Sequence, residues 1–379
     1  MTSVCANIRF EPIRAIGNDE GKNSQVFVAR DLQLDTELFI KRISKKKLEE
    51  EGVDIEDYFL EARLLYAGKH SHIAEIQYAS EDEENIYLAM PVYENGSLSA
   101  MMDNRFLTVR EIIKYSLDFL SGLAYIHSKG MIHLDIKPTN VLIDNTGKAI
   151  LTDFGLSRFL DENGFAEQRF NYKWIVDLER IQSTNRAIES DIYQVGLLIY
   201  RMCNGNNILR EQAVELGLMT PQDFGYAIIN SKYPIRKKYL PHIPMKLQRI
   251  IEKCLNVDIN TRYRNVIDIM NDLSNIEECL DWIYTPENKE VYTKIDRNFR
   301  ISISIENKNN KYYIVCIKEN LVGNTKRKMN DCCKMVTDKK DICKELKNII
   351  KKINWFQGCK GGRIWLIEKL KTKELVENF

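Results

Sequence analysis

Three polar side chains that could bind a divalent metal occur close together in the chain. Asp135 and Asn140 lie in one polar stretch, and Asp153 follows them. Between them are two apolar runs, 141–143 and 149–151, joined by residues that favour a turn. The pattern predicts a loop, a short hairpin and a second loop, which brings the three side chains to one end of a small sheet. Carboxylate and amide oxygens suit Mg²⁺, which commonly shares its ligands with phosphate groups.

The two loops also resemble a known family. The stretch His133-Leu134-Asp135-Ile136-Lys137-Pro138-Thr139-Asn140 resembles the catalytic loop of eukaryotic-type (Hanks-type) protein kinases. The triplet Asp153-Phe154-Gly155 resembles the metal-binding loop of the same family. Because both motifs occur in the family order and at hairpin spacing, the resemblance is specific.

The resemblance implies a role for each polar residue of these loops. Asp135 would accept or orient the proton of the substrate hydroxyl, and Lys137 would neutralise the γ-phosphate. Asn140 and Asp153 would hold Mg²⁺ at the phosphates of ATP. A lysine at position 137 is typical of serine/threonine kinases in this family. His133 is expected to be a packed structural residue rather than a catalytic base.

A strand nearer the N-terminus supplies the expected phosphate-binding lysine. Leu38-Phe39-Ile40-Lys41 resembles the family's Val-Ala-Ile-Lys motif, so Lys41 would bind the α- and β-phosphates of ATP. By position alone, Lys41 could equally be a surface lysine on an edge strand. Apolar residues at helical spacing place Glu61 on a following helix. By resemblance Glu61 would orient Lys41, and Glu56 is the alternative.

The remaining nucleotide contacts are implied by two further segments. Residues 16–29 resemble the loop that covers the nucleotide, although this loop is longer and Ser24 stands where the last glycine is usual. A solvated hairpin would give the same pattern. Residues 86–98 resemble the hinge between the lobes. The implied nucleotide-binding residues, besides Lys41 and Glu61, are Gly17, Gly21, Ser24, Val26, the gatekeeper Met90, Tyr93 and Leu142.

Phe39 is the main sequence argument against ATP binding. It stands where the family places a small alanine above the adenine ring. Its ring could stack beside adenine, turn away into the lobe, or fill the pocket and exclude the nucleotide. The sequence leaves these three alternatives open.

The segment after the metal-binding loop departs from the family. Leu134 replaces a frequent arginine that pairs with a phosphorylated activation loop. Residues 156–178 contain only two hydroxyl side chains, Ser157 and Tyr172. We therefore predict that activity does not need activation-loop phosphorylation. Residues 174–179 match the family's Ala-Pro-Glu poorly, which puts peptide recognition in doubt.

Several large-lobe residues are expected to support this site. Thr108 and Glu111 form a capping box that begins a core helix ending near Gly130, just before the catalytic loop. By resemblance Asp191 would hold the backbone of that loop. Arg262 would form a buried structural ion pair with Glu179, because loss of either partner would strand a charge.

The fold class expected is α+β, a bilobal protein-kinase-like fold followed by a small α/β module. The catalytic domain would span 1–284, with a β-rich lobe at about 8–92 and a helical lobe at about 93–284. Residues 285–379 read as a basic ββαβ-type module with strands at 301–305, 312–317 and 364–367 and a helical stripe from Ile342 to Ile353. The boundary falls near Thr285.

Charge and cysteine usage indicate which partners and which cellular compartment to expect for the protein. The net charge is −9 before Thr285 and +10 from Thr285 onward. The basic module could contact nucleic acid, but a solvated basic surface is favoured because no nucleic-acid motif accompanies it. Nine scattered cysteines without C-x-x-C pairs indicate reduced thiols. With no signal peptide and no apolar run long enough to span a bilayer, the sequence favours a cytoplasmic protein without a membrane partner.

The favoured function is an ATP- and Mg²⁺-dependent serine/threonine protein kinase acting on an unidentified protein. A pseudokinase scaffold is the first alternative, supported by Phe39 and the unusual glycine loop. A kinase of a small molecule is the second, supported by the altered peptide-docking segment. Binding of ATP would distinguish the two kinase functions from the pseudokinase scaffold. Labelling of a protein substrate would distinguish the protein kinase from the kinase of a small molecule.

Overall fold

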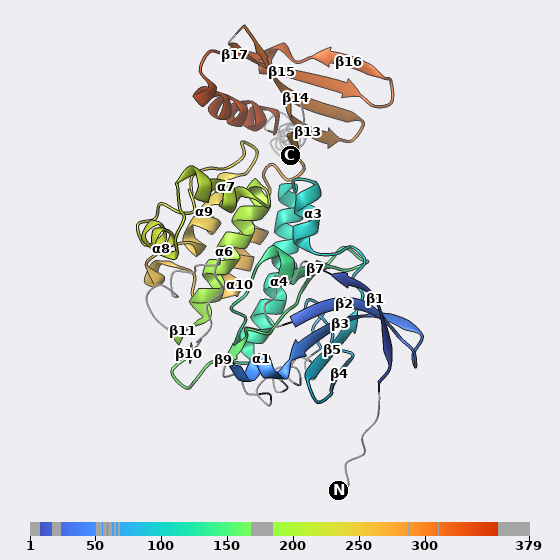
Figure 1. Cartoon of the computed structure of the whole chain (residues 1–379). Helices are drawn as coiled ribbons and strands as arrows, with labels where there is room; N and C mark the ends of the chain where they lie inside the picture. Colours follow the sequence, from blue (N-terminus) through green and yellow to red (C-terminus); the bar gives the residue numbers. More distant parts are fainter. Residues whose placement is uncertain are drawn as a thin grey trace, which may run out of the picture.

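The computed structural model describes residues 8–16, 24–50, 55, 59, 63, 66, 69–167, 185–286, 289–309 and 311–354. Figure 1 shows three parts along the molecule: a small β-rich lobe, a larger helical lobe, and a separate sheet with one helix at the far end of the helical lobe. The bilobal α+β architecture predicted from the sequence is thereby confirmed.

The small lobe is one antiparallel sheet of five strands in the order β1-β2-β3-β5-β4. Side chains alternate across β3, so Leu38 and Ile40 are buried on one face while Phe39 and Lys41 share the other. β3 pairs with a strand on each side, so Lys41 does not lie on an edge strand. The elements are β1 (Phe10–Ile16), β2 (Ser24–Asp31), β3 (Thr36–Ser44), α1 (Lys45–Glu50), β4 (Tyr78–Glu81) and β5 (Asn85–Pro91).

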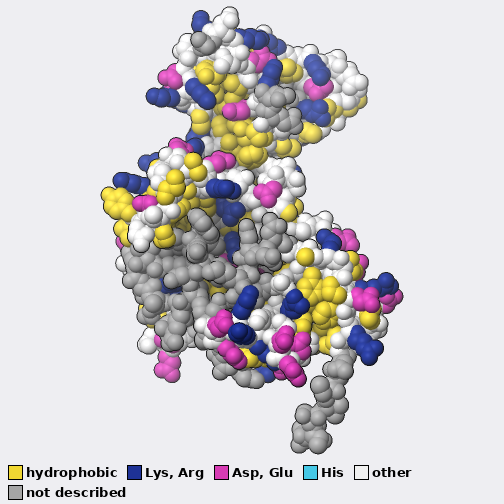
Figure 2. All heavy atoms as spheres, in the orientation of Figure 1, with side chains coloured by type: hydrophobic (Ala, Val, Ile, Leu, Met, Phe, Trp, Pro, Cys, Tyr) yellow, Lys and Arg dark blue, Asp and Glu magenta, His cyan; other side chains and the backbone are white. Residues whose placement is uncertain are grey.

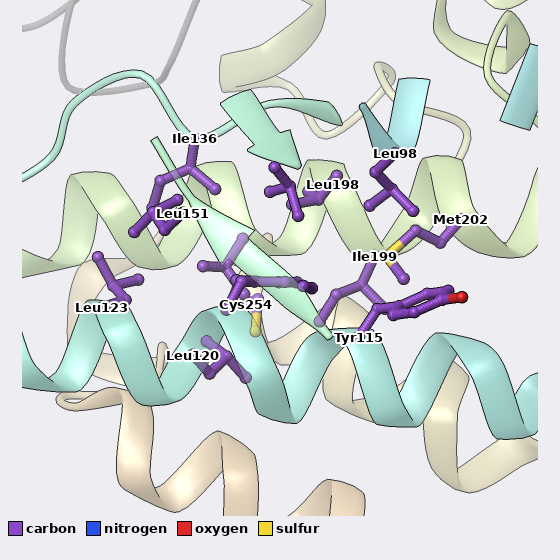
Figure 3. Packing of buried hydrophobic residues seen from close by; sticks show 14 of the residues in the cluster. Leu98, Tyr115, Leu120, Leu123, Ile136, Leu151, Leu198, Ile199, Met202 and Cys254 are labelled. Atoms are coloured by element: carbon purple, nitrogen blue, oxygen red, sulfur yellow. The ribbon is translucent and has the colours of Figure 1, made fainter. Parts of the chain in front are cut away.

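The large lobe is built around two apolar helices, α4 (Val109–Ser128) and α6 (Ile188–Asn204). Figure 3 shows Leu120 and Leu123 of α4 pointing toward the side chains of α6 across a shared core. Further helices surround this pair: α3 (Leu98–Asn104), α7 (Ile208–Glu215), α8 (Pro221–Ile229), α9 (Met245–Cys254) and α10 (Val266–Ser274).

The start of α4 follows the prediction made from its sequence. Glu111 Oε2 accepts a hydrogen bond of 2.9 Å from the backbone N–H of Thr108, and Thr108 Oγ1 accepts one of 3.2 Å from that of Glu111. The capping box is confirmed. Close packing also fixes the middle of the helix, since a Cβ at Gly122 would lie 2.5 Å from the carbonyl oxygen of His72.

Short strands join the helices near the end of α4. β7 (Val141–Ile143) pairs with β8 (Ala149–Leu151) as the predicted hairpin, and η1 (Pro138–Asn140) precedes it. Two other pairs frame this hairpin: β6 (Met131–Ile132) with β9 (Arg158–Phe159), and β10 (Ala166–Glu167) with β11 (Asn185–Arg186). The predicted order of loop, hairpin and loop is confirmed.

The C-terminal module contains more strands than the ββαβ type that the sequence predicted. Six antiparallel strands form one sheet, and a helix over 339–354 packs on it. The strands are β12 (Ile283–Pro286), β13 (Glu290–Asp296), β14 (Phe299–Lys308), β15 (Lys311–Asn320), β16 (Thr325–Lys328) and β17 (Lys334–Val336), with η3 (Asn330–Cys332) before the last. The predicted strand at 364–367 lies outside the described residues. β12 begins two residues before the expected boundary at Thr285.

The module contacts the large lobe at the N-terminal end of α4. The guanidinium of Arg110 donates to both carboxylate oxygens of Asp281, at 2.6 and 3.0 Å. The ring of Tyr284 meets that of Phe106 edge-on, with centroids 4.8 Å apart. Because α4 has 20 residues, this contact lies about 30 Å from the catalytic loop at the other end of the helix. The described residues of the module therefore do not cover that loop.

None of the described helices is both long and apolar enough to cross a lipid bilayer.

Candidate active site

Asp135, Lys137 and Asn140 form one hydrogen-bonded group in the loop after β6. Asp135 Oδ2 accepts 2.8 Å bonds from Lys137 Nζ and from Asn140 Nδ2. Asn140 Nδ2 also donates to the backbone carbonyl of Asp135, at 2.9 Å. Asp135 is 6% exposed, so its carboxylate is held in place while one edge remains accessible. The amide oxygen of Asn140 accepts a long hydrogen bond of 3.4 Å from the hydroxyl of Thr139.

Two residues of α6 hold this loop from behind. Asp191 accepts hydrogen bonds from the backbone N–H groups of His133, at 2.8 Å, and Leu134, at 2.7 Å. The role predicted for Asp191 is thus confirmed. Gln194, one turn later, accepts from the N–H of Ile136 at 2.7 Å and donates to the carbonyl of Leu134 at 2.9 Å. Sequence reasoning missed Gln194, although two polar residues three apart on a buried helix face were a usable signal.

The backbone is strained on both sides of the hairpin. Leu134 has φ of 64° and Asp153 has φ of 63°, in the left-handed region that non-glycine residues rarely adopt. Each such residue costs of order 1–3 kcal/mol and persists only where its surroundings hold it. At Leu134 two hydrogen bonds supply that restraint: its backbone N–H donates to Asp191, and its carbonyl accepts from Gln194. Strain at two loops that face each other is typical of functional sites.

Lys41 of the small lobe forms an ion pair with Asp153 of the large lobe. Burial alone would raise the pKa of Asp153, but the charge and hydrogen bond of Lys41, with the charge of Lys137, lower it to about 2. The carboxylate is therefore anionic at neutral pH. A Cβ at Gly155 would lie 3.3 Å from Lys41 Nζ, so the glycine leaves room for the pair. Glu61 and Glu56, the predicted partners of Lys41, lie outside the described residues.

His133 has the structural surroundings expected from the sequence. Its Nε2 lies 3.1 Å from the carbonyl of Thr152, and its Nδ1 accepts from the backbone N–H of Asp135 at 3.3 Å. Complete burial lowers its pKa, so the ring is neutral at physiological pH. The ring of Phe154 packs on it, with centroids 4.9 Å apart. These contacts join the two loops into one unit.

Four of the predicted nucleotide-binding residues lie in β2, in β5, just after β5 and in β7. Val26 pairs with Lys41 across β2 and β3, and Met90 pairs with Phe39 across β3 and β5. Leu142 lies in β7, half-buried, and burial raises the pKa of half-buried Tyr93. Ser24 is the first residue of β2, whereas Gly17 and Gly21 lie outside the described residues.

Phe39 lies on the same face of β3 as Lys41 and is half-buried. Its place opposite Met90 puts the ring toward the side of the sheet that carries Lys41. Phe39 is thus not part of the apolar cluster that Leu38 and Ile40 form on the opposite face of the sheet.

Glu179, the predicted partner of Arg262, lies outside the described residues. Arg262 is 2% exposed and donates to the carbonyls of Asn256 and Glu189, at 2.7 to 3.0 Å. The guanidinium therefore joins the segment after α9 to the first turn of α6.

Asn140 and Asp153 have the chemistry of a shared magnesium site. Both Nδ2 bonds of Asn140 go to Asp135, which turns its amide oxygen away from that residue, and Asp153 is ionised. Mg²⁺ is usually held by one or two protein oxygens together with substrate phosphates and water. Within the described ranges no group of three or more His, Cys, Asp or Glu side chains could hold a metal.

The two lobes and the group at their junction define the class of protein. The protein kinase domain family matches residues 10–273, and the chain belongs to this family.

Three curated proteins illustrate the relationship. The chain is 27% identical over 270 residues to "Probable serine/threonine-protein kinase PknB" of Lactococcus lactis subsp. lactis (strain IL1403). The aligned region covers 70% of this chain and 42% of that protein. It is 24% identical to "Serine/threonine-protein kinase PknD" of Protochlamydia amoebophila (strain UWE25), over 78% of this chain and 33% of that protein. It is 26% identical to "Serine/threonine-protein kinase PrkC" of Bacillus subtilis (strain 168), over 70% of this chain and 40% of that protein. The matches thus span less than half of each of these relatives.

Proposed function

We propose that the protein is an ATP- and Mg²⁺-dependent serine/threonine protein kinase. The observation that carries this proposal is the hydrogen-bonded group of Asp135, Lys137 and Asn140, facing the ion pair of Lys41 and Asp153. A chain that only packs has no need to gather these five side chains at one junction between two lobes. The names of the bacterial relatives, together with Lys137, support serine and threonine as acceptors.

The chemistry of each residue follows from its position. Asp135, fixed by two donors, accepts the proton of the attacking hydroxyl. Lys137, 2.8 Å from Asp135, also lies where it can neutralise charge on the transferred phosphoryl group. Lys41 positions the α- and β-phosphates, and Asn140 with Asp153 would hold Mg²⁺. The bound metal would supply charge stabilisation at the phosphate oxygens.

Activity without activation-loop phosphorylation is supported by the surroundings of Leu134. Its side chain is 1% exposed and packs in an apolar cluster with Ile132 and Ala166. A basic side chain that could bind a phosphate is thus replaced by a hydrophobic contact. Ser157 is 0% exposed, and Tyr172 lies outside the described residues. Treatment with phosphatase should therefore leave turnover within about twofold, and a large loss would contradict this part of the proposal.

The described cysteines are all free thiols, which is in keeping with a reducing, cytoplasmic setting.

The function is tested by incubating the full chain with labelled ATP and Mg²⁺, with and without a generic protein substrate. The variant Asp135→Asn removes the proton acceptor at nearly constant size and should lower labelling by at least about 100-fold. Asp35→Asn makes the same chemical change at an exposed position and should have no effect. Label that persists in Asp135→Asn would overturn the assignment of Asp135.

If the wild-type protein transfers no label to protein, ATP binding is measured through the melting temperature. If ATP with Mg²⁺ does not raise the melting temperature either, the protein is a scaffold that has lost nucleotide binding. If ATP binds and labels a small molecule but no protein, the acceptor class proposed here is wrong.

A further inference from the structure

The outer side of the helix over 339–354 carries a row of four lysines. Lys340, Lys344, Lys347 and Lys351 recur at spacings of four, three and four residues. At about 100° per residue they fall within an arc of about 60°. The opposite side of the helix is buried on the sheet through Ile342, Leu346, Ile349, Ile350 and Ile353. This set of four, the lysine row, lies on the side of the helix away from the sheet; three of its members are exposed and Lys347 is half-buried.

The lysine row is unfavourable for the helix that carries it. Like charges three and four residues apart destabilise a helix by about 0.2–0.5 kcal/mol for each pair. None of the four ammonium groups makes an ion pair with a carboxylate of the described residues. Glu345, the nearest acid in sequence to Lys344, is paired with Lys334, whose hydrogen bond lowers the pKa of this carboxylate; the nearby charge of Lys344 lowers it further.

Several basic residues of the sheet are paired with acids. Glu306 pairs with Lys289 and with Lys308, and Glu319 pairs with Arg300 and with Lys326, at 2.7 to 3.4 Å. Basic side chains stand on the surface of the module in Figure 2, and the acidic ones there are fewer. Several lysines of the sheet thus have acidic partners, whereas the four lysines of the row make no ion pair within the described residues.

We propose that the lysine row binds the phosphate backbone of a nucleic acid without reading its base sequence. The row spans twelve residues, so its two ends lie about 17 Å apart along the helix axis. One strand of a duplex rises about 3.4 Å per phosphate, so the row covers about five phosphates. Four evenly spaced ammonium groups suit such a repeating row of charges.

Two other anionic partners fit these residues less well. Protein interfaces are anchored by aromatic and arginine side chains and are depleted in lysine, whereas the row contains only lysine. Helices that bind membranes insert an apolar face into the lipid, whereas the apolar face of this helix is buried on the sheet. A phosphate backbone needs neither feature, because release of counterions drives its binding.

The position of the row is compatible with catalysis. The module is attached at the end of α4 that lies about 30 Å from the catalytic loop. A nucleic acid on the lysine row would therefore leave the described active-site residues accessible, and the proposal does not depend on the proposed kinase function.

The test is a fluorescence anisotropy titration of the full chain against a labelled duplex of about 20 base pairs. Four phosphate contacts predict a slope of about −3.6 for log K against log salt, which is about 150-fold weaker binding at 200 mM than at 50 mM salt. Replacing all four lysines of the row by glutamine should weaken binding at 50 mM salt by at least about 100-fold and flatten the slope. Replacing them by arginine should preserve both.

The matched control makes the same change of charge at scattered exposed positions, with glutamine at Lys46, Lys148, Lys237 and Lys311. This variant should bind the duplex within about threefold of wild type. All variants should unfold in one cooperative transition, and the glutamine variant of the row should melt no lower than wild type, because it removes repulsion between like charges. Absence of binding by the wild-type chain at 50 mM salt, or equal loss in the control variant, would overturn the proposal. Binding to vesicles of anionic lipid, with no binding to the duplex, would assign the row to a membrane surface instead.

Discussion

Asp191 Oδ1 accepts a 2.7 Å hydrogen bond from the backbone N–H of Leu134, a residue held at φ of 64°. The other oxygen of Asp191 accepts from the N–H of His133 and lies 2.8 Å from His127 Nε2. The first turn of a buried helix thereby fixes the strained backbone that carries Asp135. The geometry of the site depends on this carboxylate, although it touches no reacting atom.

Removing that carboxylate should destabilise the fold as well as the site. Asp191→Ala leaves two buried backbone N–H groups without acceptors, each worth about 1–3 kcal/mol. We expect the free energy of unfolding, measured by urea titration, to fall by about 3 kcal/mol, and labelling activity to fall with it. Asp223→Ala, which removes the N3 carboxylate of the capping box that begins α8, should lower the free energy of unfolding by about 1 kcal/mol. A loss at Asp191 no larger than at Asp223 would contradict the positioning role.

The ion pair of Lys41 and Asp153 predicts a particular dependence of stability on pH. The pKa of Asp153 is lowered to about 2, below its ordinary value of about 3.9. Its charged form therefore stabilises the fold above about pH 4, and this contribution is lost as the pH falls toward 2. In Lys41→Met, burial is left to raise the pKa of Asp153, so protonation becomes favourable.

We therefore expect the stability difference between wild type and Lys41→Met to shrink as the pH falls from 5 to 2. Urea midpoints of both proteins across this range give the measurement. Lys45→Met, which removes a pair with Glu81 at the surface, is the control. A difference at Lys41 that stays constant with pH would show that the pair does not set the pKa of Asp153.

Phe39 should line the nucleotide site rather than close it. Its half-buried ring shares a face of β3 with Lys41, so Phe39→Ala removes apolar contact area from a bound base. We expect ATP to bind about tenfold more weakly, measured by titration of the purified variant, and Leu34→Ala at an exposed turn to have no effect. Tighter binding of ATP by Phe39→Ala would instead mean that the ring obstructs the pocket.

Two neighbouring residues at the start of the C-terminal module, Asp281 and Trp282, should contribute very differently to stability. Trp282 is fully buried in the core of the module, so Trp282→Ala should lower the free energy of unfolding by about 3–5 kcal/mol. Arg110→Ala breaks the bidentate pair with Asp281, but both side chains are more than two-fifths exposed and the loss should stay below about 1 kcal/mol. Chemical denaturation of both variants gives the comparison, and equal losses would contradict it.

The sequence by itself determined the features that depend on neighbouring residues. Thr108 and Glu111 specify a helix start, and the turn at 144–147 specifies the hairpin, because these structures form from contacts within a few residues. The motifs around Asp135 and Asp153 identified the family, since phosphoryl transfer needs these residue types in a fixed order.

Only the tertiary structure decided which distant residues meet. The pairing of β3 with strands on both sides removed the edge-strand interpretation of Lys41, and α6 brought Gln194 under the catalytic loop. β16 could not be predicted because all four of its residues are exposed and no alternating pattern marks them. The direction of the lysine row, too, depended on which side of its helix is buried on the sheet. Such relationships follow from packing between segments far apart in the chain, which local patterns do not encode.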